Sequence, residues 1–211
     1  MTVAPLGDSA VVITLGEAID AATVARVRAV AAMLGRHPPA GVVDIVPAFA
    51  SVALFFNGPP PGVFEALHAE IAALVARAED SVVSLDGRVV EVPVCYGGEH
   101  GPDLDAVAAH TGRTAAEVVA RHSGADYLVH AIGFAPGFPY LGGLPPELAT
   151  PRRASPRRRV PAGAVGIGGA QTGIYPLETP GGWNLIGRTP LPLFDLTLPN
   201  PARLRIGDTV K

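Results

Sequence analysis

The glycine and proline content of this chain changes near residue 133, and that change constrains the fold more than any other feature of the sequence. Residues 1–132 hold 12 glycines and 9 prolines, whereas the shorter segment 133–211 holds 13 of each. Both residues interrupt helices and central strands, so segment 133–211 is expected to form short strands joined by turns. This pattern is typical of an all-β barrel or sandwich.

The first part of the chain alternates between strand and helix patterns. Runs of strand length lie at 10–15, 42–46, 51–56 and 88–96. Apolar residues at helical spacing predict one helix after Asp20, which can cap it, and a second helix from Phe64 to Val75. The resulting order, βαββαβ, predicts a ferredoxin-like sandwich with both helices on one face of a sheet.

Two short helices are expected between residues 103 and 124. Asp103 can cap the first, Gly112 can end it, and Thr114 with Glu117 forms a capping box for the second. A DNA-binding helix-turn-helix is disfavoured, because the second helix carries only Arg121 as a basic side chain that could bind phosphate. We therefore expect an α/β sandwich domain at 1–86 and a β-barrel domain at 87–211 that includes this helical hairpin.

Charged and sulfur-containing residues exclude several kinds of protein. The net charge is -3, which gives no reason to expect nucleic acid as a partner. The single cysteine, Cys95, excludes an internal disulfide and a four-thiolate zinc site, and is interpreted as a small apolar residue. The only lysine is Lys211, so no internal lysine can carry biotin or bind phosphate in a Walker-type loop. If ATP or biotin is used, its lysine must belong to another chain.

Targeting and catalytic signatures are also missing. The first ten residues lack the charged and apolar regions of a secretory signal, and no apolar run reaches the ~20 residues that span a bilayer, so a cytoplasmic protein is expected. Serine hydrolase, zinc protease and Walker motifs are absent, and the histidines lack metal-ligand spacing, so no metal is expected. Most histidines should lie on the surface or on helix faces. His130, in an apolar strand, is either a core residue or a weak candidate for proton transfer.

Two segments after residue 132 are rich in side chains that bind ligands. In GFAPGFPYLGGLP (133–145), Phe134, Phe138 and Tyr140 stand among glycines and prolines, which favours a pre-ordered loop that walls a pocket, docks a partner or covers the core. In PRRASPRRRVP (151–161), five arginines repel one another unless anions, a partner's carboxylates or solvent surround them. These arginines are Arg152, Arg153, Arg157, Arg158 and Arg159.

A third segment, GGAQTGIYPLETPGGWNLIGRTP (168–190), combines neutral amides with one arginine. Gln171 and Asn184 offer donors and acceptors, Tyr175 a hydroxyl, Trp183 a stacking face and Arg188 a bidentate fork. Such a set suits a small planar amide or carboxylate better than a metal ion.

These segments, together with LIGRTPLPLFD and the upstream VPVCYGGEHGPDLDAVAAHTG, resemble the motifs of allophanate hydrolase subunit 1. That family includes the B-type subunit of 5-oxoprolinase, the kinase inhibitor KipI and half of the carboxyltransferase domain of urea amidolyase. The match is close from about residue 90 onward and looser before it. One departure is His100, where an aromatic residue such as Phe is expected.

The resemblance implies a cyclophilin-like β-barrel behind an α/β domain, and a site that a second subunit completes. It implies a partner related to allophanate hydrolase subunit 2 or to the C-type subunit of 5-oxoprolinase, and a LamB/YcsF-type subunit. ATP, bound mainly by partner subunits, would drive hydrolysis of 5-oxoproline to glutamate. Hydrolysis of allophanate, a urea carboxyltransferase-like role, and inhibition of a sensor histidine kinase stay open as alternatives.

Each candidate residue then has an expected role. Gln171 and Tyr175 would bind the amide, and His130 would transfer a proton. Arg159 or Arg188 would bind the substrate carboxylate, and Phe138 and Trp183 would form walls. The aromatic loop and the segment that carries Gln171, Tyr175, Trp183 and Arg188 are expected to converge on one pocket, which another polypeptide completes.

Overall fold

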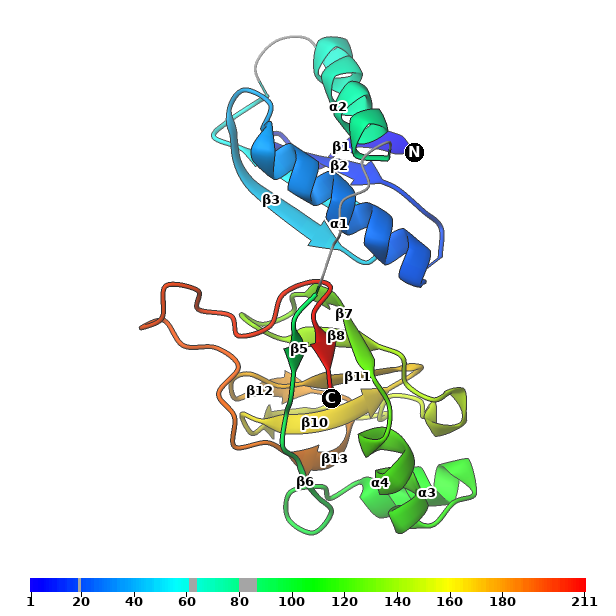
Figure 1. Ribbon diagram of the computed structural model, residues 1–211. Helices are drawn as coiled ribbons and strands as arrows, with labels where there is room; N and C mark the ends of the chain where they lie inside the picture. The colour runs from blue at the N-terminus through cyan, green and yellow to red at the C-terminus, as the bar shows by residue number, and fades with distance from the viewer. Residues whose placement is uncertain (19, 61–63, 80–86) are drawn as a thin grey trace. The chain divides into compact units, whose positions relative to one another are not determined.

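The computed structural model describes residues 1–18, 20–60, 64–79 and 87–211 (Figure 1). The chain divides into two compact units, Met1–Asp86 and Gly87–Lys211. The boundary expected between residues 86 and 87 therefore adjoins residues 80–86, which lie outside the described part of the chain. Each unit has its own buried apolar core.

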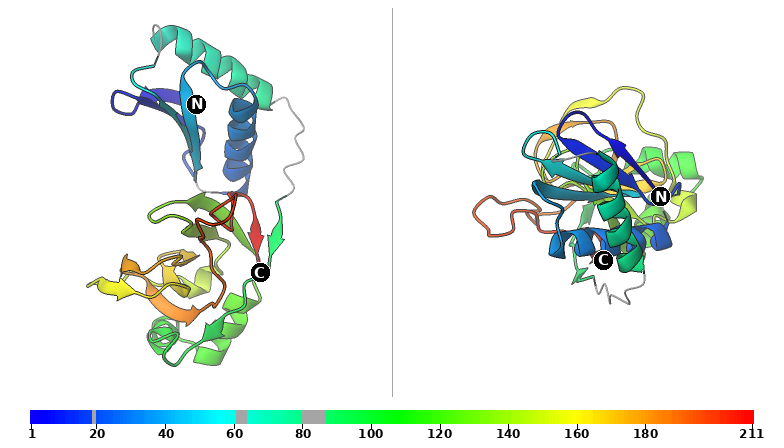
Figure 2. Two further views of the ribbon diagram at one scale, coloured as in Figure 1. Left: turned by 90° about the vertical axis from the view of Figure 1, so that its left-hand side faces the viewer. Right: turned by 90° about the horizontal axis from the view of Figure 1, so that it is seen from above.

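The first unit is a four-stranded antiparallel sheet with two helices. Its strands are β1 (Thr2–Pro5), β2 (Ala10–Thr14), β3 (Val42–Ala48) and β4 (Ser51–Phe56), in the spatial order β1-β2-β4-β3. Helices α1 (Ala21–Arg36) and α2 (Phe64–Glu79) pack together on one face of the sheet (Figure 2). Along β4, Val52, Leu54 and Phe56 are buried while Phe55 is 36% exposed, so only one face of the sheet is covered.

The expected strand at 88–96 does not belong to this sheet, so that part of the βαββαβ prediction is wrong. It forms two short strands of the second unit: β5 (Val89–Val90) pairs in parallel with β14 (Thr209–Val210), and β6 (Cys95–Tyr96) pairs with β13 (Asn184–Arg188). The place beside β2 is taken by β1, which the sequence pattern missed because it has only four residues. Alternation predicts a strand but does not identify its partner.

The second unit is a mainly antiparallel β structure with few helices. Its central sheet has the order β7-β8-β11-β10-β13-β6, β14 pairs with β7, and β9 with β12 forms a separate ribbon. The other elements of this unit are α3 (Leu104–Thr111), α4 (Ala115–Ser123), β7 (Tyr127–Ile132), β8 (Pro139–Gly142), a 3-10 turn (Pro146–Leu148), β9 (Arg157–Val160), β10 (Ala164–Gly168), β11 (Gln171–Ile174) and β12 (Thr179–Gly181).

The helical hairpin formed by α3 and α4 follows the sequence prediction except at its first residue. Thr114 and Glu117 make both bonds of the capping box, and Gly112 ends α3 with a φ of 65°. Asp103 stands at the N-cap of α3, but its side chain makes no capping bond. The carboxylate is used elsewhere, which corrects the expectation that it caps the helix.

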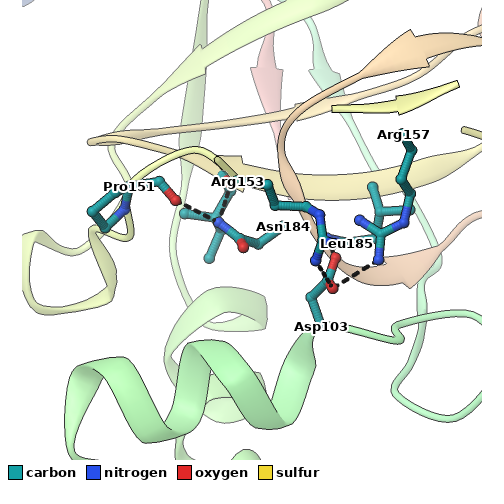
Figure 3. A network of polar contacts seen from close by, with 7 residues as sticks. Asp103, Pro151, Arg153, Arg157, Asn184 and Leu185 are labelled. Atoms are coloured by element: carbon teal, nitrogen blue, oxygen red, sulfur yellow. Dashed lines mark hydrogen bonds and ion pairs between the residues drawn. The ribbon is translucent and has the colours of Figure 1, made fainter. Parts of the chain in front are cut away.

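The Asp103 carboxylate joins three segments that are distant in sequence (Figure 3). Oδ1 accepts bonds of 2.8 Å from both Arg153 and Arg157, and Oδ2 accepts a bond of 2.7 Å from the Leu185 backbone nitrogen. The side chain of Asp103 is 5% exposed, against 37% for Arg153 and 24% for Arg157. A buried carboxylate requires such partners, because an unpaired charge away from water is costly.

A second buried network surrounds His122, one of the histidines expected on the surface or on a helix face; it lies on helix α4 but is buried. Its Nε2 lies 2.9 Å from Thr172 Oγ1, and its Nδ1 lies 2.7 Å from the Tyr96 hydroxyl. Thr172 donates its own hydrogen to the Gly166 carbonyl, so it accepts from Nε2. Burial favours the neutral ring, in which Nδ1 accepts from the Tyr96 hydroxyl, and the ring borders a largely apolar cavity of about 170 Å³.

Replacing Asp103 with Ala should strongly destabilise the second unit. Asp103→Ala leaves two arginines and one backbone donor without their acceptor, and because the arginines are partly exposed we expect a loss of about 2–3 kcal/mol in the free energy of unfolding. Urea denaturation measures this loss. The matched control is exposed Asp105 in the first turn of α3, where Asp105→Ala should cost at most about 1 kcal/mol. Equal losses in the two variants would contradict the role assigned to Asp103.

The His122 network predicts a pH-dependent stability. Burial lowers the pKa of His122 to about 4, below the ordinary value of 6.5, and burial also lowers the pKa of His130. The unfolded chain then binds protons that the folded chain does not, so stability is full above pH 6.5 and falls as the pH drops toward 4. His122 alone should contribute a loss of about 2 kcal/mol between pH 7 and pH 5.

Unfolding free energies measured by urea denaturation at several pH values test this dependence. The His122→Gln variant should show a smaller loss than the unsubstituted protein between pH 7 and pH 5. Replacing exposed His110 with Gln is the control and should leave the pH profile unchanged. An identical profile in His122→Gln and the unsubstituted protein would refute the assignment.

Candidate functional site

A pocket of about 190 Å³ in the second unit is lined mainly by aromatic and arginine side chains, and we call it the aromatic pocket. Its lining residues are Phe134, Phe138, Tyr140, Arg152, Arg153, Pro156, Tyr175, Gly181, Gly182 and Trp183. They come from β8 and the loop before it, the arginine-rich segment, the residue after β11, and the end of β12 with the turn that follows it. All three candidate ligand-binding segments identified in the sequence after residue 132 therefore contribute to it.

Three buried rings form the base of the aromatic pocket. Phe138 packs edge-to-face with Tyr175 and Trp183, at ring centroid distances of 5.1 Å and 5.6 Å. The exposed fractions of Phe138, Tyr175 and Trp183 are 2%, 2% and 5%. Edge-to-face pairs of this kind add stability beyond the area they bury, so the base is a rigid, apolar surface.

Glycines make this close packing possible. A Cβ at Gly181 would lie 2.4 Å from the Tyr175 hydroxyl oxygen, and one at Gly168 would lie 2.6 Å from the Trp183 ring. Any larger residue at either position would displace an aromatic ring. The glycines in this segment thus shape the base of the pocket, and do not form a nucleotide-binding turn.

Phe134 stands at the mouth of the aromatic pocket. Its ring contacts Phe138 at 5.4 Å and Tyr175 at 6.3 Å between centroids, yet its side chain is 62% exposed. Its φ of 71° lies in the left-handed region, which is strained for a bulky residue. Strain of this kind concentrates at ligand sites, where the surrounding structure holds it in place.

Two arginines give the aromatic pocket a positive charge. Arg152 places its guanidinium 5.8 Å from the centroid of the Trp183 ring, which is cation–π range. Arg153 is held by Asp103 (Figure 3). No carboxylate belongs to the lining, and burial raises the pKa of the Tyr175 hydroxyl, which stays protonated as a donor. The pocket therefore suits a small, flat ligand with a negative charge or a polar amide.

The predicted site residues are only partly brought together. Phe138, Tyr175 and Trp183 line the aromatic pocket. Gln171 begins β11, is half-buried and does not line it, and Arg159 forms an ion pair of 2.8 Å with Glu178 while its side chain is 78% exposed. Arg159 is thus directed by its ion pair and not by the pocket. Because Gln171 and Arg188 do not line the pocket, the expected convergence of the aromatic loop and the whole segment from Gln171 to Arg188 is wrong.

His130 is buried in β7, a strand of the central sheet, and does not line the aromatic pocket. A Cβ at Gly142 would lie 1.9 Å from its ring, so β8 packs directly against it. Its Nδ1 is buried and has no hydrogen-bond partner among the described residues. Burial lowers the pKa of His130 and favours the neutral ring.

Arg188 lines a different and larger cavity of about 530 Å³, together with Cys95 and His100. Its Nε donates to the Ala162 carbonyl at 2.8 Å. Cys95 is exposed there, which corrects its interpretation as a small apolar residue. Spacing in the sequence grouped Arg188 with Trp183, but the side chains of β13 alternate between the two faces of the sheet.

The roles of Arg152, Asp103 and His122 were missed at the level of sequence. Arg152 was one of five similar arginines, and only its position over Trp183 distinguishes it. In residues 1–18, 20–60, 64–79 and 87–211, no helix is long and apolar enough to span a membrane, and no group of three or more His, Cys, Asp or Glu residues could hold a metal ion.

Comparisons with known proteins agree with the architecture. Residues 1–204 match the family model for the carboxyltransferase domain, subdomains C and D. The chain is 45% identical to the B-type subunit of 5-oxoprolinase from Bacillus subtilis, covering 98% of this chain and 89% of the relative. It is also 45% identical to the corresponding B-type subunit from Escherichia coli O157:H7, covering 98% and 92%.

Solved structures show the same fold within longer chains. The structure of TTHA0988 superposes with a TM-score of 0.81 at 39% identity and covers 96% of this chain, which spans only 39% of that protein. The match to urea amidolyase of Kluyveromyces lactis has a TM-score of 0.77 at 21% identity, so the two share the fold. This match covers 99% of the present chain but only 14% of that chain. The chain thus belongs to the family of the 5-oxoprolinase B-type subunit, whose fold is that of carboxyltransferase subdomains C and D.

Proposed function

We propose that this chain is one component of a heteromeric ATP-dependent amide or lactam hydrolase, with 5-oxoproline as substrate and glutamate as product. The observation that carries the proposal is the 45% identity, over 98% of the chain, to proteins named as the B-type subunit of 5-oxoprolinase. We also propose that the first unit is ferredoxin-like, that the second unit is a cyclophilin-like β-barrel, and that the protein is cytoplasmic.

The aromatic pocket supports substrate recognition as the role of this chain. 5-Oxoproline is a flat five-membered lactam with one carboxylate, and the pocket offers apolar rings and the Arg152 guanidinium without a competing carboxylate in its lining. Arg152 replaces Arg159 and Arg188 as the proposed partner of the substrate carboxylate, because its guanidinium lies over the Trp183 ring. Tyr175 remains a proposed amide contact. Gln171 and His130 do not line this pocket, and their proposed roles, amide contact and proton carrier, apply to the site that a partner subunit completes.

ATP is proposed to be handled by partner subunits. Opening a resonance-stabilised lactam in water requires activation of its carbonyl, which phosphorylation by ATP can supply. The only lysine is Lys211, so this chain lacks the internal lysine of a Walker-type phosphate loop. The proposed partners are the C-type subunit of 5-oxoprolinase, related to allophanate hydrolase subunit 2, and a LamB/YcsF-type subunit.

Allophanate or another urea-type substrate is the second candidate. The observation that favours it is the fold shared with Kluyveromyces lactis urea amidolyase, at 21% identity. An assay of the reconstituted complex with 5-oxoproline and with allophanate, measuring ATP hydrolysis that depends on each, separates the two. If the complex turns over neither substrate, the hydrolase proposal is wrong, and inhibition of a sensor histidine kinase is the remaining candidate.

Substitution of Arg152 should weaken substrate use in the reconstituted complex. Arg152→Gln removes a charged hydrogen-bond donor, whose loss of about 1.5–3 kcal/mol corresponds to a fall of roughly 10–100-fold in kcat/KM. Steady-state 5-oxoproline-dependent ATP hydrolysis measures it. Arg158→Gln, in the same arginine-rich segment but outside the pocket lining, is the matched control and should retain kcat/KM. Equal values for the two variants would exclude Arg152 from the site.

Phe134→Ala should lower kcat/KM with little effect on folding, because the ring is largely exposed. The matched control is Leu196→Ala, which removes another exposed apolar side chain, 79% exposed, from the same unit. Thermal unfolding of both variants shows that the fold is retained. Unchanged turnover in Phe134→Ala would show that the mouth of the pocket does not contact substrate.

The proposed amide contact of Gln171 has a separate test. Gln171→Ala should lower kcat while leaving the melting temperature almost unchanged, because the side chain is half-buried and does not belong to a core cluster. If kcat is retained, Gln171 has no part in the reaction.

A further inference from the structure

The cavity around Arg188 contains residues of two sequence motifs that the aromatic pocket does not use. Its lining residues are Cys95, His100, Ala162, Gly163, Pro176, Arg188, Thr189, Pro190, Leu191 and Pro192. Its volume of about 530 Å³ exceeds the 190 Å³ of the aromatic pocket. A cavity of this size with apolar walls and a few polar groups is the usual form of a small-molecule site.

The sheet places Arg188 and Cys95 side by side. They are directly opposed residues of the antiparallel strands β13 and β6, so their side chains project from the same face with Cβ atoms about 5 Å apart. The neighbouring Tyr96 projects from the other face, where its hydroxyl bonds to His122. The cavity and the buried His122 network therefore lie on opposite sides of β6.

The charge of this cavity is positive. Nε of Arg188 is held at 2.8 Å by the Ala162 carbonyl, and no described carboxylate accepts a bond from the two terminal nitrogens. The lining has no acidic residue; Glu99, 88% exposed, approaches His100 Nε2 at 3.9 Å. A guanidinium fixed through Nε leaves its other donors for a carboxylate or phosphate oxygen.

The walls of the cavity are rigid. Pro176, Pro190 and Pro192 are fixed in φ, and Gly163, at a φ of 82°, has no space for a Cβ, which would lie 2.2 Å from the Thr189 carbonyl oxygen. Such a rim is pre-ordered, so a ligand meets it at low entropic cost. We infer that this cavity is a second binding site, separate from the aromatic pocket, for a small anion whose carboxylate or phosphate pairs with Arg188.

The sole cysteine of the chain provides a direct test. Cys95 is exposed and lines the cavity, so alkylation of its thiol by iodoacetamide, followed by mass spectrometry, reports whether the cavity is open. This reagent is neutral and is not attracted by Arg188. An anion present at ten times its Kd leaves about one-tenth of the sites empty, so alkylation should slow about tenfold.

The probes are inorganic phosphate, 5-oxoproline and 2-pyrrolidinone, each used with the full chain at constant ionic strength. Protection by phosphate identifies a phosphate site, and protection by 5-oxoproline identifies a carboxylate site. 2-Pyrrolidinone is the same lactam without the carboxylate and should not protect. Protection by neither anion, or equal protection by 2-pyrrolidinone and 5-oxoproline, would overturn the inference.

Variants assign the effect to Arg188. Protection is the ratio of the alkylation rates without and with the anion, taken for each variant against its own unliganded rate, because a neighbouring guanidinium also affects thiol reactivity. Arg188→Gln should abolish protection, Arg188→Lys should reduce it less, and Arg158→Gln should leave it intact. Protection that persists in Arg188→Gln would also overturn the inference. Because the measurement requires neither partner subunits nor turnover, its failure would not affect the proposed hydrolase function.

Discussion

The arrangement of the second unit depends on one buried carboxylate. Asp103 accepts hydrogen bonds from two guanidinium groups and one backbone N–H, and so fixes the start of α3 against both β13 and the arginine-rich segment. Without this acceptor, Arg153 and Arg157 would repel each other next to the Arg152 side chain. The carboxylate thus compensates part of the positive charge of the arginine cluster and holds Arg153 and Arg157 in place. Arg152 is not bound by Asp103, and its guanidinium lies over the Trp183 ring.

Strand β11 separates the cavity beside His122 from the base of the aromatic pocket. Thr172 bonds to His122, next to the cavity inside the unit, while the adjacent Gly173 faces the rings of Phe138 and Trp183. The alternation of side chains along a strand explains how consecutive residues serve both sides. Helix α4, which carries His122, is therefore linked through a single hydrogen bond to the strand that supports the base of the aromatic pocket.

Local chemistry in the sequence predicted local structure well. The capping box of Thr114 and Glu117, the glycine stop at Gly112 and the family motifs each depend on neighbouring residues, and these were identified correctly.

Predictions about long-range partners were less successful. The strand at 88–96 was assigned to the wrong sheet, and Asp103 was taken for a cap because its arginine partners lie about fifty residues away. The exposed Cys95 and the separation of Arg188 from Trp183 likewise depend on strand pairing and on the faces of β13, which residue spacing does not specify.

The glycines beneath the aromatic rings restrict how this pocket can change. Gly168 and Gly181 have no room for a methyl group, and the three rings above them are almost fully buried. A new ligand preference is therefore difficult to acquire through the base of the pocket without loss of folding. Diversification is confined to Phe134 and Arg152 at the outside of the pocket, because Tyr140 packs edge-to-face with Phe138 and Trp183 at ring centroid distances of 5.0 Å and 6.0 Å. An engineer who wishes to redirect this scaffold to another small anion should begin with a library at those two positions.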